Sequence, residues 1–240
     1  MSSTWVVGDI HGCSEELEEL VEGLNLGPTD KLISVGDLYH RGPDPVGVVD
    51  VLSSVKNFSL VLGNHELAML KRNNLDGDLP DGSDFGVLSD EVEVLEAEFL
   101  LGDGGTAMAP VPPARSVDLV RFLEGHSFFL QGEAAERTWW IVHAGLVPGR
   151  KPEECTPFEL ARMRRIHSSQ ESPFWYEVYE GPELVIFGHT PSQLPRTRYA
   201  GENLVALGLD TGCVYGGCLT AYCVEDDEFY TVTAKRDWAS

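Results

Sequence analysis

The sequence predicts an α/β fold, with the α+β feature of a strand-rich second half, in which two mixed sheets pack face to face and helices lie outside. Three observations support this. Residues 5–62 alternate short apolar runs with longer amphipathic stretches, the pattern of strand–helix–strand crossovers. Residues 127–233 contain further apolar runs separated by turns, enough for a second sheet. Several runs end at a glycine beside a polar residue, as strands do where they lead into a site.

The first third of the chain predicts two right-handed parallel crossovers. Cys13 or Ser14 begins the first helix, whose first turn carries Glu15 and Glu16 at the positive end of the helix dipole. Gly27 and Pro28 end the region of this first helix, before the next strand begins. The expected elements are a strand ending at residue 7, a helix to residue 24, a strand over 31–35, a helix over 45–55, a strand over 58–62 and a helix over 65–71.

The second half predicts mostly strands. Apolar runs flank a polar turn as in a hairpin, and a short helix carries three arginines. The expected strands are 128–131, 138–142, 183–187, 204–207, 218–224 and 229–233, and the expected helix is 157–166.

Residues 73–118 differ in character from both halves, and we expect them to form a cap-like insertion beside the site. Residues 91–101 favour a helix and residues 102–113 a loop. The acidic stretch 76–82 is similar to a calcium loop, but its glycine lies one position late and no glutamate follows at the required distance, which favours a solvated loop.

Composition limits the function classes. The chain has 240 residues and a net charge of −22, which disfavours binding to nucleic-acid backbones. No apolar run approaches the roughly 18 residues of a membrane span, and residues 1–4 carry no basic segment. We therefore expect a single cytoplasmic domain over residues 1–240 that binds neither nucleic acid nor membrane.

The five cysteines form no recognisable disulfide or zinc framework, because their number is odd and no Cys-x-x-Cys pair occurs. Cys213, Cys218 and Cys223 are five residues apart, which places neighbours on opposite faces of a strand. We expect them to be small core residues.

Metal-ligating side chains follow the ends of five apolar runs. A single histidine or a Gly-Asp pair is usually structural, but five such strand ends favour a common site. Their mixed oxygen and nitrogen ligands suit two ions such as Mn, Fe or Zn if one carboxylate bridges them. The candidate ligands are Asp9, His11, Asp37, Asn64, His143 and His189.

Six glycine-containing motifs stand at or near these strand ends. They are Gly8-Asp9-Ile10-His11-Gly12, Gly36-Asp37 with Arg41-Gly42, Gly63-Asn64-His65-Glu66, His143-Ala144-Gly145, Gly188-His189-Thr190 and residues 209–217. Together they resemble the signatures of the phosphoprotein phosphatase family of calcineurin-like metallophosphoesterases. The resemblance implies a four-layer α/β/β/α sandwich with two divalent metal ions, manganese first and Fe, Zn, Co or Ni as alternatives. It implies that Asp9 and His11 hold the first ion, that Asn64, His143 and His189 hold the second, and that Asp37 bridges them.

The same resemblance implies the catalytic roles. Arg41 would bind phosphoryl oxygens with its planar guanidinium, and His65 would be the general acid that protonates the leaving oxygen after attack by a metal-bridging hydroxide. Arg164 is the first candidate for a second phosphate-binding arginine, with Arg162 and Arg165 as alternatives. One position departs from the family: the protein phosphatases usually carry Asp where this chain has His40.

These observations lead to a main functional hypothesis and three alternatives. The main hypothesis is a phosphatase acting on small phosphomonoesters or phosphopeptides, including phosphoserine and phosphothreonine. A symmetrical dinucleoside tetraphosphatase is the first alternative, supported by residues 209–217 and by His40. A nuclease or phosphodiesterase of the wider superfamily is less favoured, because Pro191 stands where those enzymes commonly have a second histidine. A non-catalytic binding module is least favoured, since no ligand is missing. The oligomeric state stays open.

Overall fold

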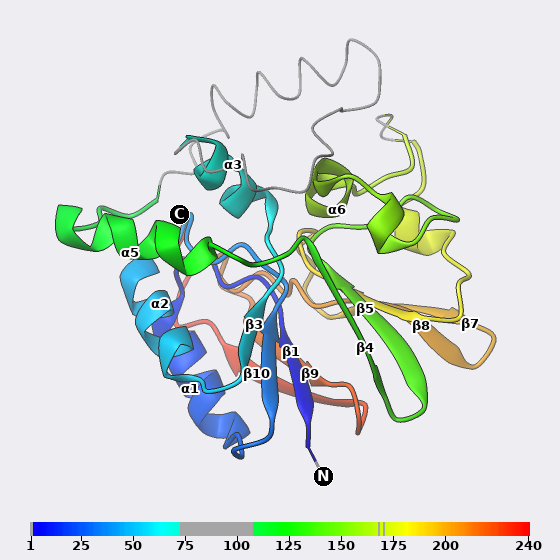
Figure 1. Cartoon of the computed structure of the whole chain (residues 1–240), viewed down its shortest axis with the longest axis horizontal. Coiled ribbons are helices and arrows are strands. Elements are labelled where there is room, and N and C mark those ends of the chain that lie inside the picture. Colours follow the sequence, from blue (N-terminus) through cyan, green and yellow to red (C-terminus); the bar gives the residue numbers. More distant parts are fainter. Residues whose placement is uncertain (1, 73–107, 168, 170) are drawn as a thin grey trace.

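Two five-stranded mixed sheets face each other in the computed structural model, which describes residues 2–72, 108–167, 169 and 171–240 (Figure 1). The first sheet has the strand order β10-β9-β1-β2-β3 and the second has β4-β5-β6-β8-β7. The strands are β1 (Thr4–Val7), β2 (Lys31–Ser34), β3 (Phe58–Leu60), β4 (Phe129–Ala134), β5 (Arg137–Val142), β6 (Leu184–Phe187), β7 (Arg196–Ala200), β8 (Asn203–Gly208), β9 (Cys218–Cys223) and β10 (Glu228–Thr233).

Helices lie outside the sheets, as the sequence predicted. In Figure 1, α1, α2 and α5 lie on the side of the first sheet that faces away from the second. The helical elements of the described residues are α1 (Ser14–Leu24), α2 (Pro45–Ser54), α3 (Asn64–Arg72), α5 (Pro113–Leu123), α6 (Pro157–Arg162) and the 3-10 turns η2 (Pro152–Glu154) and η3 (Trp175–Glu177).

The predicted crossovers form the part of the first sheet from its middle strand β1 to its edge strand β3. Strands β1, β2 and β3 are parallel, with α1 and α2 as their connections, and β9 joins β1 in antiparallel orientation. In the second sheet β5, β6 and β8 are parallel, and β4 and β7 are antiparallel edge strands. The carboxyl ends of the parallel strands in each sheet therefore lie together.

The predicted hairpin is formed by β4 and β5. Its two turn residues, Ala135 and Glu136, both have positive φ angles, of 50° and 60°. Two such residues are typical of a type I′ turn, whose twist matches that of the paired strands. The hairpin extends the second sheet at one edge.

Apolar side chains fill the space between the sheets and beneath the helices. Val6 and Ile33 of the first sheet belong to one buried cluster with Ile141 and Ile186 of the second. On the outer side of the first sheet, α1 buries Leu17 and Leu20, and its Val21 and Leu24 are half-buried on the same stripe. The outer side of the second sheet is covered near β6 by the aromatic residues of η3.

Three elements differ from the expectation. Helix α5 was not predicted, because it begins at consecutive prolines and buries only Leu119 and Leu123. Strand β7 was not predicted, because its half-buried edge position leaves it without an apolar run. Helix α6 ends at Arg162 rather than at residue 166, since Met163 is already extended.

The proposed insertion is described only in part. Residues 73–107 lie outside the described residues, and with them the loop expected at 76–82 and the helix expected at 91–101. Residues 108–118 are described: 108–112 lead into α5, and 113–118 belong to it. Within the described ranges, none of the helices has both the length and the apolar character needed to cross a membrane.

Candidate metal centre

Five strand ends bring polar side chains to one edge of the facing sheets. Asp9 follows β1, Asp37 follows β2 and Asn64 follows β3, while His143 and His189 follow β5 and β6 of the second sheet. All five side chains are buried. The strand topology thus places the predicted residues in one cluster, because parallel strands present their carboxyl ends at a common edge.

Asp37 lies at the centre of this cluster. Its Oδ2 atom is 3.4 Å from Nε2 of His143, 3.7 Å from Nε2 of His11 and 3.8 Å from Nε2 of His65. Burial alone would raise the pKa of Asp37, but the charges of His143 and His65 hold it well below its ordinary value. Asp37 is therefore an ionised carboxylate that faces imidazoles on two sides, as a bridging ligand must.

His143 faces a second group of ligands. Its Nε2 atom lies 3.0 Å from Oδ1 of Asn64 and 3.2 Å from Nδ1 of His189, while Nδ1 lies 2.9 Å from the carbonyl oxygen of Val35. A backbone carbonyl at Nδ1 fixes the ring so that Nε2 points into the cluster. Burial lowers the pKa of His143, but Asp37 outweighs it and raises the pKa to about 9, so this position attracts positive charge.

Asp9 and Asp210 add two buried carboxylates. The backbone N–H of His189 lies 3.1 Å and 3.0 Å from the two carboxylate oxygens of Asp9. Burial, and next the charge of Asp210, raise the pKa of Asp9 well above its ordinary value. Burial likewise raises the pKa of Asp210 to about 6, against a hydrogen bond from the Gly212 N–H. Asp210 was not predicted as a site residue.

His11 lies beside Asp37, and Arg41 lies beside His11. A terminal nitrogen of Arg41 is 2.6 Å from Nε2 of His11, and the guanidinium lies 5.9 Å from the ring centre of Tyr215. Burial lowers the pKa of His11 well below its ordinary value, although Asp37 opposes this. Arg41 therefore places a fixed positive charge at the edge of the cluster.

His65, predicted as the general acid and not as a ligand, lies beside His11 and the predicted bridge Asp37. Its ring packs edge-on against His11 with centroids 5.5 Å apart and at a 32° tilt against His40 with centroids 4.6 Å apart. Nitrogen and oxygen atoms of His11, Asp37 and His65 lie within 4.8 Å of one another, as do those of Asp37, His143 and His189. Asp9 belongs to neither triplet.

Among the three candidate arginines, Arg164 reaches the cluster. Its guanidinium donates a 2.9 Å hydrogen bond to the carbonyl oxygen of His189. Arg165 instead lies over the ring of Phe174 at 3.9 Å and bonds Ser172. Arg162 lies 5.6 Å from the ring centre of Phe158. Arg41 and Arg164 thus approach the centre beside different histidines.

The backbone is strained at the same positions. His11, Asp37, Arg41 and His189 have φ angles of 48°, 54°, 77° and 62°. Residues other than glycine rarely adopt this left-handed region, and such strain persists where the surrounding structure enforces it, often at functional sites. The strain here coincides with the strand ends that carry the cluster.

Glu66 was not predicted as a site residue but organises the loops around it. Its Oε2 atom accepts hydrogen bonds from the backbone N–H groups of Asp37 and Gly63, at 2.8 Å and 2.9 Å, and Oε1 accepts one from Leu38 at 2.9 Å. Burial, and next Asp37, raise its pKa to about 7. Its position in the first turn of α3, three residues after Gly63, was the available signal.

The donor set fits divalent metal ions. Several buried carboxylates have pKa values raised by burial and by one another, which a cation would relieve. Imidazole, carboxylate and amide ligands without sulfur are typical of sites for manganese, iron and similar ions. The described residues therefore offer a centre whose chemistry is incomplete without positive charge.

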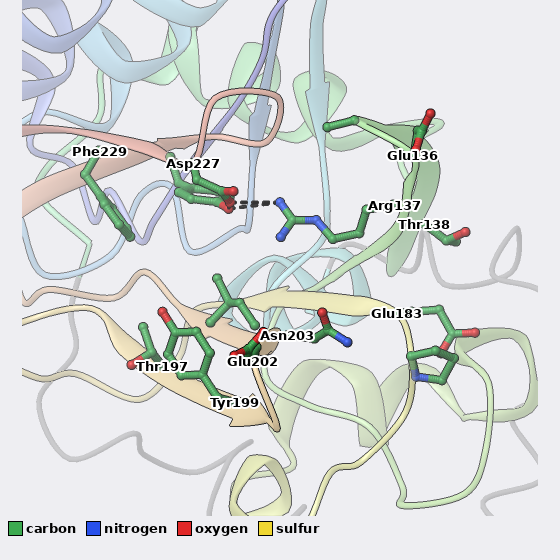
Figure 2. A pocket seen from close by; sticks show the side chains of 14 residues that line it. Glu136, Arg137, Thr138, Glu183, Thr197, Tyr199, Glu202, Asn203, Asp227 and Phe229 are labelled. Carbon is green, nitrogen blue, oxygen red and sulfur yellow. Dashed lines mark hydrogen bonds and ion pairs between the residues drawn. The ribbon is translucent and has the colours of Figure 1, made fainter.

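A cavity of about 840 Å3 lies away from this cluster, at the opposite ends of the strands. Figure 2 shows it between the β4–β5 turn, the β7–β8 turn and the β9–β10 turn. Arg137 spans its upper part and donates to Asp227 at 3.0 Å. None of the predicted site residues lines it, so the metal-ligating cluster lies outside this cavity.

Comparisons with known proteins agree with this geometry. The family described as "Calcineurin-like phosphoesterase" matches residues 2–193. A symmetrical bis(5'-nucleosyl)-tetraphosphatase of Serratia proteamaculans is 29% identical, with 98% of this chain and 95% of the relative covered. An asymmetrical bis(5'-nucleosyl)-tetraphosphatase PrpE of Halalkalibacterium halodurans is 26% identical over 98% and 95% of the two chains.

Solved structures show the same fold. A crystal structure provisionally assigned as a diadenosine tetraphosphatase has a TM-score of 0.71 at 27% identity and covers 97% of this chain and 94% of its own. A protein serine/threonine phosphatase from Saccharomyces cerevisiae has a TM-score of 0.53 at 13% identity, over 100% and 84% of the two chains. The second likeness concerns the fold alone.

Proposed function

The chain belongs to the calcineurin-like phosphoesterase family, and from this premise we propose that it hydrolyses dinucleoside tetraphosphates symmetrically, converting diadenosine tetraphosphate into two molecules of ADP. Family membership makes the protein a metallophosphoesterase, a hydrolase of phosphoester bonds. One observation carries the finer proposal: two relatives named as symmetrical tetraphosphatases are 29% and 28% identical over 98% of this chain and 95% or more of their own length, against 26% identity for the asymmetrical relative.

The proposed site holds the phosphate chain through two arginines. Arg41 beside His11 and Arg164 beside His189 offer planar guanidinium groups that match phosphoryl oxygens. A tetraphosphate carries charge on several consecutive phosphates, so cations at two places along it are needed to bind and orient it. This arrangement suits a polyphosphate at least as well as a monoester.

His65 is the proposed proton donor. Its ring lies in the buried pocket formed by His11, His40 and Asp37, where it can deliver a proton to the leaving phosphate oxygen. When bound, two divalent ions held by Asp9, His11, Asp37, Asn64, His143 and His189 would polarise the phosphoryl group and activate water. Manganese is the proposed ion.

The hypothesis placed first from the sequence, a phosphatase acting on phosphomonoesters and phosphopeptides, has less support. The likeness to a protein serine/threonine phosphatase is confined to the fold. The comparisons favour the tetraphosphatase alternative because named relatives cover the chain from end to end. The single domain over residues 1–240 and the cytoplasmic location stay predictions.

Product analysis tests the proposal. The full chain with Mn2+ should convert diadenosine tetraphosphate into ADP alone, detected by anion-exchange chromatography at short reaction times. Formation of ATP with AMP would indicate asymmetrical cleavage and would refute the proposal. A phosphoserine peptide and p-nitrophenyl phosphate serve as comparison substrates. A higher kcat/KM for the phosphopeptide than for diadenosine tetraphosphate would favour the protein phosphatase hypothesis instead.

Replacing Asp37 with asparagine tests the centre itself. Asp37→Asn keeps the shape but removes the negative charge that faces His11 and His143, so both ions should bind more weakly. We expect activity to fall by more than the roughly 10- to 100-fold that follows loss of a residue supporting a ligand. Metal content by elemental analysis should drop as well. A variant that retains two ions and near-normal turnover would disprove the bridging role.

A further inference from the structure

Two cysteines and a glutamate meet in the interior, behind two loops of the phosphoesterase centre. Cys13 is the residue before α1, Glu16 lies in the first turn of that helix, and Cys213 lies in the loop after β8. All three are at most 1% exposed. One sulfur or oxygen atom from each lies within 4.8 Å of the others.

Glu16 supplies an independent indication that a ligand belongs here. Its Oε1 atom accepts hydrogen bonds of 2.9 Å from the Lys235 backbone N–H and from the Trp238 indole, while Oε2 is buried and has no hydrogen-bond partner. The ammonium group of Lys235 pairs with Glu15 instead, at 2.7 Å. Burying a carboxylate oxygen without a partner is costly. A cation at this position would remove that cost.

The two thiols lie against each other and otherwise have only weak partners. The Cys13 sulfur lies 3.8 Å from the carbonyl oxygen of His11 and makes no helix cap. A bound metal ion would provide the positive charge that two adjacent thiolates require.

From this geometry we propose that Cys13, Glu16 and Cys213 form a second metal site, selective for a thiophilic divalent cation such as Zn2+. Zinc accepts cysteine sulfur and carboxylate oxygen together, whereas calcium and magnesium demand oxygen ligands. On binding, each thiol releases its proton to solvent and the ion takes two sulfurs and one oxygen. The phosphoesterase centre contains no sulfur, so the two sites differ in the ions they prefer.

A disulfide between the same cysteines explains less of the structure. Oxidation would join the two sulfurs but would leave Oε2 of Glu16 buried and unpartnered. A cation bound by Oε2 of Glu16 and both sulfurs would satisfy all three side chains at once. Sequence spacing could not reveal the site, because Cys13 and Cys213 come from distant segments that the fold brings together.

The site would connect two loops of the phosphoesterase centre. Cys13 follows the loop that carries Asp9 and His11, and Cys213 follows Asp210. Through Glu16 it would also reach the C-terminal segment, which lies against α1. A metal ion here would act as a structural cross-link with no part in the phosphoester reaction.

Cadmium titration tests the proposal on the full chain. Reduced protein, with Mn2+ saturating the first centre, is titrated with Cd2+ while the sulfur-to-cadmium charge-transfer absorption is followed. We expect saturation at one equivalent, loss of the band in Cys13→Ser and Cys213→Ser, and a band that needs higher Cd2+ concentrations in Glu16→Gln. The matched controls Cys155→Ser and Cys223→Ser, outside the group, should keep the wild-type band.

Two results would overturn the site. One is the absence of a charge-transfer band in reduced wild-type protein. The other is a band that survives both Cys13→Ser and Cys213→Ser while disappearing in a control variant. If either serine variant fails to fold, cadmium NMR of the wild type decides, because a resonance in the two-sulfur range supports the site and resonances confined to oxygen and nitrogen coordination refute it.

Discussion

His40 is the residue beside the proposed acid, and its ring lies 4.6 Å from that of His65. A carboxylate at this position would stabilise protonated His65, whereas an imidazole does not. We therefore expect His40→Asp to move the basic limb of the kcat profile to higher pH for an alkyl phosphate, whose leaving group needs a proton. The limb should stay unchanged for p-nitrophenyl phosphate and shift little for diadenosine tetraphosphate, whose leaving phosphate is a weak base.

Rate profiles of wild type and variant on the three substrates make this measurement. An unmoved basic limb for the alkyl ester would mean that His65 does not donate the proton or that residue 40 does not influence it. An equal shift for all three substrates would point instead to an effect on the metal-activated nucleophile.

The sequence predicted which side chains gather because they follow apolar strands, most of them next to a glycine. Asp210 escaped because a leucine separates it from Gly208, so it does not share the pattern of Gly8-Asp9 or Gly36-Asp37. Glu66 escaped for a different reason. Its contacts are backbone N–H groups from two loops, and these meet only after folding.

At the scale of elements, Glu66 joins α3 to the loop after β2. Glu66→Gln keeps the size but replaces one acceptor oxygen with a donor that faces N–H groups. We expect a loss of about 1–3 kcal/mol of unfolding free energy and a fall in kcat, because Asp37 is held by this bond. Urea unfolding measures the loss of unfolding free energy, and steady-state kinetics measure the fall in kcat. The control is Glu159→Gln, which changes a glutamate in the first turn of α6. Unchanged stability would disprove the role.

His126 lies between α5 and β4, against Phe58 and Phe122, with ring centroids 6.4 Å and 6.1 Å away. Burial lowers its pKa, opposed by a hydrogen bond to the backbone of Phe122. The unfolded chain therefore binds a proton more readily than the folded one, so stability is lost as the pH falls below about 6.5. His126→Phe should keep the ring contacts and remove this part of the pH dependence.

Unfolding of wild type and His126→Phe in denaturant, from neutral to mildly acidic pH, gives the comparison. The difference in unfolding free energy between the two proteins should change in favour of the variant as the pH falls. A constant difference would show that His126 is protonated equally in both states.

Helices and strands could be predicted where the burial of a face imposes a periodic apolar pattern on the sequence. They could not be predicted where little of the element is buried. The stripe of α1 and the central parallel strands bury one or both faces, so their apolar pattern is clear. Strand β7 alternates between half-buried and exposed positions at a sheet edge, and α5 buries two leucines. These weakly buried elements carry too little pattern to distinguish them from loops.

For the whole molecule, the charge of −22 is the dominant electrostatic property. Like charges spread over one small protein repel one another and favour expansion. Added salt screens this repulsion over a Debye length of about 10 Å at 0.1 M. We expect the melting temperature to rise with sodium chloride in the low-salt range, measured by calorimetry on protein with a fixed metal content.

Potassium chloride should give the same rise, because screening depends on ionic strength rather than on the ion. A melting temperature that falls with salt would mean that favourable ion pairs such as Arg115 with Asp50 outweigh the repulsion.

The ligands of the metal centre are also synthesised at different times, because they lie far apart in the sequence. Asp9 and His189 touch across 180 residues of sequence, with Asp37, Asn64 and His143 between them. A ribosome would therefore deliver the first ligands well before the last, and a nascent chain would hold only a partial set. We expect the metal ions to bind after synthesis, when the second sheet packs against the first. The ions that are free in the cell at that time would then decide which metal form of the enzyme is produced.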